Sequence, residues 1–82
     1  MGVLSEIYQG EKIINKYKSS NIKSSIYEND TKKLIIEFNG GRKYEYLDVP
    51  SNVCASFRKA KSQGQYFSKN IVKKYDYKLV SN

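Results

Sequence analysis

The sequence predicts an α+β fold, in which a three-stranded antiparallel β-meander is followed by two short helices. Apolar and polar residues alternate with a period of two over residues 20–49, and the turn-forming stretches ENDT (28–31) and NGG (39–41) interrupt that alternation. After Pro50 the apolar residues recur at helical spacing instead. The chain has 82 residues, a length that suits a single domain.

The three strands are expected over about residues 22–27, 34–38 and 44–49. Asn and Gly tolerate positive φ, so NGG is a strong hairpin signal between the second strand and the third. Tyr44 and Tyr46 point to the same side of the third strand, opposite the leucine and valine that follow them. If those two apolar residues point into the core, both tyrosines lie on the outer face of the sheet.

The first helix is expected over residues 52–61, with Ser51 as its N-cap. Val53, Phe57 and Ala60 recur at i, i+4 and i+7, so they share one face of this helix. The single cysteine, Cys54, lies beside that face, where we expect a small buried residue.

A second short helix is expected over about residues 69–75, with Ser68 as its N-cap. In this interpretation Gly64 takes the left-handed conformation that ends the first helix. Apolar and polar residues alternate again over 75–80, which predicts a possible additional terminal strand.

Residues 1–18 are expected to form an N-terminal extension, and residues 19–82 the single domain. Leu4, Ile7 and Tyr8 fit one face of a helix, although Gly10 interrupts the pattern. We expect this extension to pack on the domain or on a second copy of the chain. In the second case the chain would form a homo-oligomer.

Composition favours an anionic partner. The net charge is +7, which attracts nucleic acid, a nucleotide or an acidic protein surface, although a basic balance also serves solubility. Only two of the fifteen cationic residues are Arg, so the bidentate Arg contacts used in reading duplex DNA are scarce. One Cys and no His leave no internal disulfide, and we expect no metal site and no cofactor.

Membrane and export signals are not expected. No apolar run approaches the roughly 20 residues of a membrane span, and the first ten residues lack the basic and apolar regions of a signal peptide. The expected location is therefore the cytoplasm.

Most of the chain resembles the KTSC domain, a family named for its place at the C-terminus of some lysyl-tRNA synthetases. The matching parts are SSNI (19–22), a tyrosine at 27, the pattern L.I.F..G..Y.Y..VP (34–50) and S.G.YF...I...Y (62–75). The resemblance implies a compact meander-plus-helix domain that occurs as a small protein of bacteria and their phages. Its fusion to the synthetases suggests RNA binding, and it carries over no catalytic residues.

Three stretches of the family pattern are expected to converge into a ligand site: SSNI, GGRKYEY (40–46) and SQGQYFSKN (62–70). They supply short polar groups, cations and flat rings, which are the parts that bind the phosphate and base of a nucleotide. The candidate ligand-binding residues are Ser19, Ser20, Asn21, Arg42, Lys43, Tyr44, Tyr46, Lys61, Ser62, Gly64, Tyr66, Phe67, Lys69 and Asn70. The alternative is structural, with Gly64 and Ser68 as helix caps and Phe67 in the core.

These residues favour a binding module rather than an enzyme, because the groups for general acid–base catalysis are missing. Two ligands stay open: a small signalling nucleotide sequestered in a pocket, and RNA or single-stranded nucleic acid along a basic face. The alternative is a protein-interaction module that docks on a host or phage protein through its tyrosine-rich face.

Overall fold

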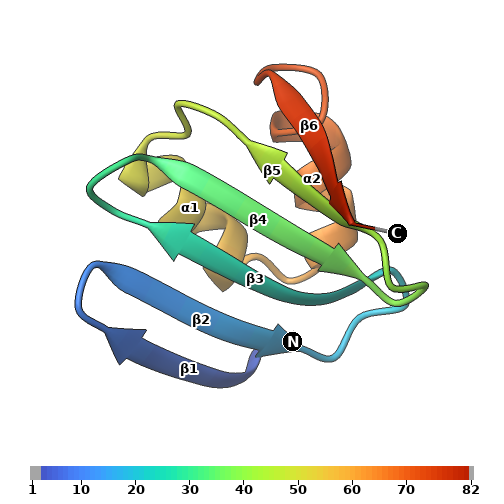
Figure 1. The fold of residues 1–82 in the computed structure, drawn as a ribbon. Coiled ribbons are helices and arrows are strands. Elements are labelled where there is room, and N and C mark those ends of the chain that lie inside the picture. The colour runs from blue at the N-terminus through green and yellow to red at the C-terminus, as the bar shows by residue number, and fades with distance from the viewer. Residues whose placement is uncertain (1–2, 82) are drawn as a thin grey trace.

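The computed structural model describes residues 3–81 (Figure 1). The elements follow one another as β1 (Val3–Gln9), β2 (Lys12–Tyr17), β3 (Ile22–Glu28), β4 (Lys33–Phe38), β5 (Lys43–Tyr46), α1 (Ser51–Lys59), α2 (Gln63–Asn70) and β6 (Tyr77–Ser81). The predicted α+β class is confirmed, and so are the strands at β3, β4 and β5 and the terminal strand at β6.

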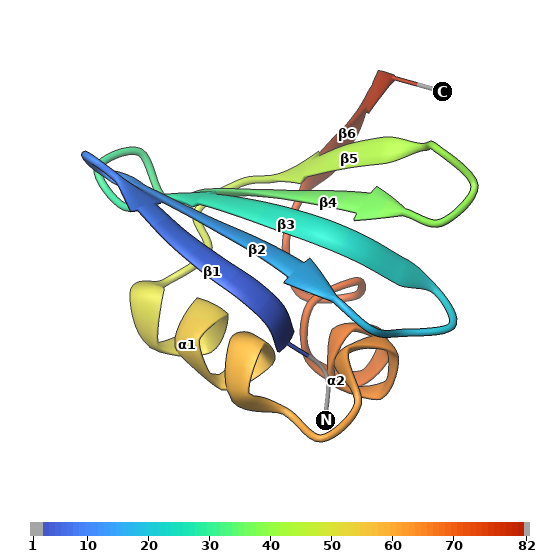
Figure 2. The ribbon, with the colours of Figure 1, turned by 90° about the horizontal axis from the view of Figure 1, so that it is seen from below.

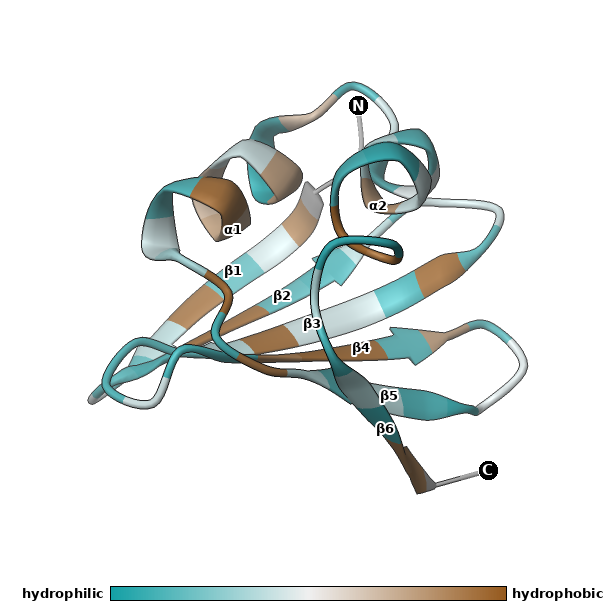
Figure 3. Cartoon of the chain, turned by 90° about the horizontal axis from the view of Figure 1, so that it is seen from above, coloured by the Kyte–Doolittle hydropathy of each residue, from teal (hydrophilic) through white to brown (hydrophobic). Residues whose placement is uncertain are grey.

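The strands form one six-stranded antiparallel sheet in the order β1-β2-β3-β4-β5-β6, so the predicted three-stranded meander undercounts the strands. Both helices lie between β5 and β6 in the chain and cover the same face of the sheet (Figure 2). Figure 3 shows this arrangement from the opposite side, with hydrophobic residues distributed along the strands. Within residues 3–81, no helix covers the second face of the sheet.

The N-terminal segment forms a hairpin that extends the sheet. Strand β1 pairs with β2, and β2 pairs with β3, with Ile14 opposite Ile26. Gly10 has a φ of 58°, a conformation that glycine adopts without strain, and it lies in the tight turn of this hairpin. The helical face predicted for Leu4, Ile7 and Tyr8 is therefore wrong, because Gly10 reverses a strand instead of interrupting a helix.

Helix α2 begins well before the predicted residue 69. Its N-cap is Ser62, whose hydroxyl accepts a hydrogen bond from the backbone N–H of Gln65 at 3.3 Å. Ser68 and Gly64 therefore lie inside α2, and their predicted roles as caps are wrong. Helix α1 lies where it was expected, but its N-cap is Pro50, with no side-chain hydrogen bond, so Ser51 is not the cap.

Gln63 explains why α2 begins so soon after α1. Its side chain is buried, and Nε2 donates to the carbonyl oxygens of Ala60 at 3.0 Å, Arg58 at 3.4 Å and Phe57 at 3.5 Å. Carbonyl groups in the last turn of a helix lack intrahelical partners. The Phe57 carbonyl also accepts from the backbone N–H of Ala60 at 3.3 Å, and the Gln63 amide supplies a further donor to this helix end. This residue therefore joins the end of one helix to the start of the next.

The core lies between the sheet and the two helices. Its buried apolar residues include the predicted Cys54 and Phe67, and the full set is Tyr17, Ile22, Tyr27, Leu34, Ile36, Tyr46, Val49, Cys54, Phe57, Phe67 and Ile71.

The expected outward orientation of the two tyrosines of the third strand is wrong. Tyr46 is only 2% exposed, and Tyr44 packs against the core from the same side of β5. The strand ends at Tyr46, and Asp48 takes a φ of 55°, which breaks the alternation before Val49. Val49 is therefore also buried, and its carbonyl oxygen accepts a hydrogen bond from the Tyr27 hydroxyl at 2.6 Å.

Candidate functional site

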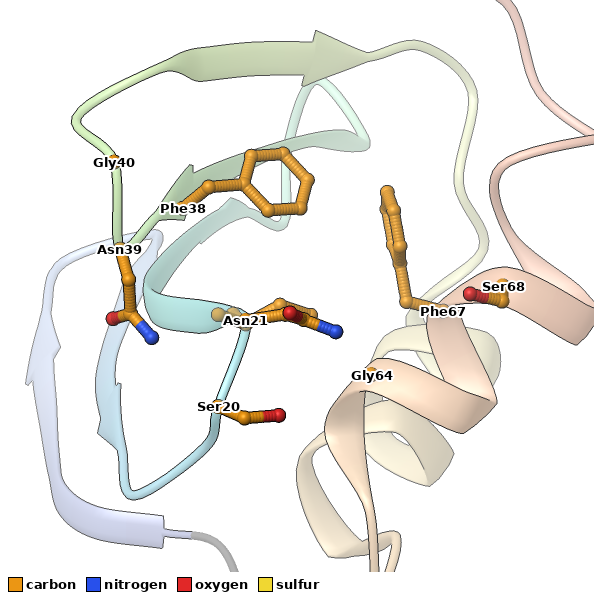
Figure 4. Close-up of a pocket in the computed structure, with 9 residues that line it drawn as sticks. Ser20, Asn21, Phe38, Asn39, Gly40, Gly64, Phe67 and Ser68 are labelled. Carbon is orange, nitrogen blue, oxygen red and sulfur yellow. The ribbon is translucent and has the colours of Figure 1, made fainter.

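Three adjoining hollows form a groove between α2 and the ends of the sheet strands. The central hollow, of about 350 Å³, is lined by Ser20, Asn21, Ile22, Phe38, Asn39, Gly40, Gly64, Phe67 and Ser68 (Figure 4). The polar hollow, of about 360 Å³, is lined by Ser19, Ser20, Asn21, Ser62, Gly64, Gln65, Ser68 and Lys69. The aromatic hollow, of about 380 Å³, is lined by Phe38, Arg42, Tyr44, Tyr46, Phe67, Val72 and Tyr77.

The three hollows adjoin one another, because neighbouring hollows share lining residues. Phe38 and Phe67 line both the central and the aromatic hollow, while Asn21 and Gly64 line both the central and the polar hollow. Each volume is within the range typical of small-molecule sites. The groove therefore changes along its length from polar to aromatic.

The strand side of the groove is held by hydrogen bonds between two connections. The Ser19 hydroxyl accepts from the backbone N–H groups of Asn21 at 3.2 Å and Ile22 at 3.3 Å. Asn39, in the β4–β5 turn, donates from Nδ2 to the Ser19 carbonyl at 2.9 Å and from its backbone N–H to the Asn21 carbonyl at 2.9 Å. The β2–β3 connection and the β4–β5 turn are thus fixed against each other.

Helix α2 forms the opposite side of the groove. Gly64 lies in its first turn, facing Asn21 (Figure 4). A β-carbon added at Gly64 would meet the Asn21 Nδ2 atom at 3.4 Å and fill part of the space between the two walls. The serine side chains of both walls bring hydroxyl groups to this end of the groove.

The aromatic end is a cluster of packed rings. Phe38 contacts Phe67 with ring centroids 5.5 Å apart and Tyr44 at 5.8 Å, and Tyr77 lies 5.5 Å from Tyr44 and 5.4 Å from Tyr46. Tyr77 is 54% exposed, so its ring offers a face to a ligand. Burial raises the pKa of Tyr46 to about 12, which keeps this hydroxyl protonated at neutral pH.

The charged side chains in the groove are cationic. Arg42 lines the aromatic hollow and Lys69 the polar hollow, and no acidic residue is among the residues that line the three hollows within the described range 3–81. An anionic group is therefore favoured at either end.

Most of the predicted site residues line this groove. They are Ser19, Ser20, Asn21, Arg42, Tyr44, Tyr46, Ser62, Gly64, Phe67 and Lys69. Tyr66 instead packs beside Phe57 at a centroid distance of 6.3 Å, and Asn70 Nδ2 donates to the Tyr66 carbonyl at 3.3 Å. Lys43 points to the sheet face opposite Tyr44, and Lys61 lies in the α1–α2 connection, outside the lining of the three hollows.

The sequence prediction missed several lining residues: Ile22, Phe38, Asn39, Gly40, Gln65, Ser68, Val72 and Tyr77. Asn39 and Gly40 belong to the predicted NGG turn, and Phe38 ends the strand before it. Their position beside Arg42 in the same hairpin could have identified them as lining residues from the sequence. Ser68 was predicted as a cap, and its place one helical turn after Gly64 follows once α2 is known to begin at Gln63.

Residues 3–81 contain no group of three or more His, Cys, Asp or Glu side chains placed to hold a metal ion. No helix within the same range is long and apolar enough to cross a membrane. Cys54 is buried, and burial raises the pKa of its thiol.

Comparison with known proteins identifies one family. The model of the KTSC domain matches residues 18–75, which contain β3 to β5 and both helices. Lysine–tRNA ligases of Trichormus variabilis and Nostoc punctiforme are 42% and 41% identical over 66 residues, 80% of this chain. The chain spans only 12% of the length of these curated relatives.

A solved structure shows the same fold. The crystal structure of a KTSC domain protein from Yersinia pestis superposes with a TM-score of 0.78 at 32% identity. The match covers 83% of this chain and 96% of the other.

Proposed function

This chain belongs to the KTSC domain family, and we propose that it is a non-catalytic binding module whose groove holds a phosphate-bearing ligand, in the first place a small nucleotide. The observation that supports this proposal is the order of the three adjoining hollows, from an aromatic end through a central hollow to a polar end. A nucleotide has the same order of parts, because a flat base is joined through a sugar to an anionic phosphate.

The aromatic end supports binding of the base. Tyr77 and Tyr44 present rings beside the aromatic hollow, and Arg42 lies on its lining. Stacking of a base on an aromatic side chain contributes about 1–3 kcal/mol in single-strand binding proteins. Arg42 can add a planar guanidinium that stacks or donates hydrogen bonds.

The polar end supports binding of the phosphate. Lys69 supplies a positive charge, and the Ser20 and Ser68 hydroxyls and the Asn21 amide supply donors around the same hollow. The N-terminal end of α2 also lies there, and its partial positive charge adds to the attraction of an anion. The base and the phosphate would then occupy opposite ends of one groove, with the sugar over Gly64.

The chemistry of the lining supports binding without catalysis. The functional groups of the lining are hydroxyls, amides, aromatic rings and two cations, beside aliphatic residues and glycines. The raised pKa of Tyr46 disfavours this tyrosine as a base. A module that only binds a signalling nucleotide lowers its free concentration, and such sequestration needs no reacting group.

RNA is the second candidate ligand, favoured by the relatives. The curated proteins that match 66 residues of this chain are named lysine–tRNA ligases, and their substrate includes an RNA. A net charge of +7 supports the same interpretation. In that case the groove would take one nucleotide of a longer strand, and lysines outside the groove would contact the neighbouring phosphates.

Native mass spectrometry of the chain purified from a bacterial cytosol tests the proposal first. We expect a stoichiometric nucleotide, released by denaturation and identified by its mass. The next step is a titration with ribonucleoside monophosphates and triphosphates and with single-stranded oligo(U). Nucleotide binding should be weakened about tenfold or more by Lys69→Ala and Tyr77→Ala, whereas Lys32→Ala, in the β3–β4 turn, is the matched control.

The outcomes distinguish the candidates. Binding of oligo(U) with a steep loss of affinity in salt, and equal effects of Lys32→Ala and Lys69→Ala, favours extended RNA binding. Retained nucleotide binding in both folded groove variants contradicts the groove as the site. A chain that binds neither kind of ligand favours the alternative of a protein-docking module.

A further inference from the structure

The helix-free face of the sheet carries a row of four isoleucines. The register places Ile7 opposite Ile14, Ile14 opposite Ile26, and Ile26 opposite Ile35, so one row crosses β1, β2, β3 and β4. Ile26 lies between Ser25 and Tyr27, whose side chains are buried on the helix side, and the row therefore points away from the helices. We call these four residues the isoleucine row.

The row is unusual for a sheet face in contact with water. In antiparallel sheets with one face on the core, the solvent-exposed face normally carries polar residues, which alternate along each strand with the buried apolar ones. Here Ile7 is 49% exposed, and the other three are partly exposed. Two of the four, Ile7 and Ile14, come from the β1–β2 hairpin, which lies outside the residues 18–75 matched by the family model. The hairpin thus doubles the number of isoleucines in the row, from two to four.

Three charged residues and one glutamine flank the row in a specific order. Gln9, Lys12, Glu28 and Lys33 are paired in register on one side of it, across the same four strands. Lys12 Nζ lies 3.8 Å from Glu28 Oε2 within the chain, and Lys12 remains about half exposed. The central two strands therefore present a cation on β2 and an anion on β3.

This order is complementary to itself. A two-fold axis parallel to the strands, placed between β2 and β3, lays β2 of one copy over β3 of the other and β1 over β4. Ile14 then faces Ile26 of the partner subunit, and Ile7 faces the partner's Ile35. The same rotation brings Lys12 over Glu28 of the partner subunit and Glu28 over the partner's Lys12, so opposite charges meet twice.

We propose that this chain forms a homodimer in which the isoleucine rows of two copies pack face to face about that axis. The two sheets form a sandwich with the helices on its outer sides, an arrangement in which inner faces lie about 10 Å apart. The groove lies between α2 and the sheet and stays accessible, so the dimer does not depend on the proposed function.

The size of the face predicts a weak dimer. Four strands about 4.8 Å apart and about six residues long, at 3.3 Å each, cover roughly 400 Å² in each copy. That is smaller than a standard protein interface, so we expect a dissociation constant in the micromolar range. Each copy carries a net charge of +7, and the repulsion between the two copies weakens the dimer further.

Sedimentation velocity over a range of concentrations tests this dimer directly. Ile7→Lys should weaken it at least about tenfold, because a cation would replace an apolar contact at the row. Leu79→Lys is the matched control, since Leu79 is also 49% exposed and lies on an edge strand, but on the helix side of β6. Its dimerisation should equal that of the unchanged chain.

Charge exchange tests the symmetry axis. Lys12→Glu alone and Glu28→Lys alone should each weaken the dimer, because like charges then face each other between copies. The double variant should restore it, and circular dichroism checks that each variant folds. A chain that stays monomeric up to about 1 mM overturns the proposal, and so does a dimer that Ile7→Lys leaves intact or that Leu79→Lys disrupts equally.

Discussion

A β-carbon added to Gly64 would lie 3.4 Å from the amide nitrogen Nδ2 of Asn21, so the first turn of α2 and the β2–β3 connection approach to within van der Waals contact of a methyl group. The side chain at position 64 therefore sets the width of the groove. Gly64 is inside a helix without a positive φ, so its conformation does not require glycine.

Gly64→Ala should leave the fold intact and raise its free energy of unfolding by about 0.4–1 kcal/mol, since alanine reduces the freedom of the unfolded chain and favours the helix. Urea unfolding measures this change. Gly64→Leu should instead block the groove and abolish nucleotide binding while the circular dichroism spectrum stays native. Nucleotide binding that survives in the leucine variant would place the ligand elsewhere.

Tyr27→Phe should destabilise the protein by about 1–3 kcal/mol, because the buried Val49 carbonyl loses the hydroxyl that donates to it at 2.6 Å. Thermal unfolding gives the magnitude. Tyr77→Phe is the comparison, since this tyrosine is exposed at the sheet edge, and it should change stability by less than about 0.5 kcal/mol. Equal effects of the two changes would contradict a structural role for the Tyr27 hydroxyl.

Glu6→Gln should loosen the N-terminal hairpin without unfolding the rest. The Glu6 carboxylate lies 3.4 Å from Arg58 Nε on α1 and accepts a hydrogen bond from Asn15 Nδ2 at 2.8 Å. The hydrogen bonds from Tyr8 and Asn15 lower the pKa of Glu6, and so does the nearby charge of Arg58. Loss of this charge should cost about 1 kcal/mol locally. Hydrogen exchange should then be about fivefold faster in β1 and unchanged in β3 and β4.

Glu11→Gln, in the exposed turn of the same hairpin, is the control for that experiment. It removes an identical charge away from Arg58 and should leave exchange in β1 unchanged. If both variants accelerate exchange equally, net charge rather than the contact with α1 stabilises the hairpin.

Stability should decrease at alkaline pH. Burial raises the pKa of Tyr46 to about 12 in the folded protein, above its ordinary value of 10.0. The unfolded chain therefore loses this proton first, so stability is retained below about pH 10 and is lost as the pH rises toward 12. Circular dichroism followed against pH measures this loss, and Tyr46→Phe should shift the unfolding transition to higher pH.

The sequence predicted those strands that are marked by a pattern among neighbouring residues. Alternation and the NGG turn are enough for β4 and β5, because each depends on neighbouring residues. The start of α2 was not predictable in this way. Ser62 and Ser68 are both good caps, and the choice of Ser62 depends on Gln63 reaching the carbonyls at the end of α1, a contact between elements.

The same error in the start of α2 explains which of the predicted residues line the groove and which do not. The strand-side residues Ser20 and Asn21 line the groove as predicted, because they lie in a connection that the pattern located. On α2, the helical register decides which side chains face the groove. Phe67 and Lys69 do, while Tyr66 faces α1, and only a correct helix start distinguishes them.

The order of strands has a consequence for how the chain folds. Each of the strands β2 to β5 pairs with the strand before it across a short connection, so these contacts close small loops and should form early. The pairing of β5 with β6 is different, because both helices lie between them in the chain. We therefore expect β6 to join last in refolding and to separate first, so its formation signals that the helices have docked.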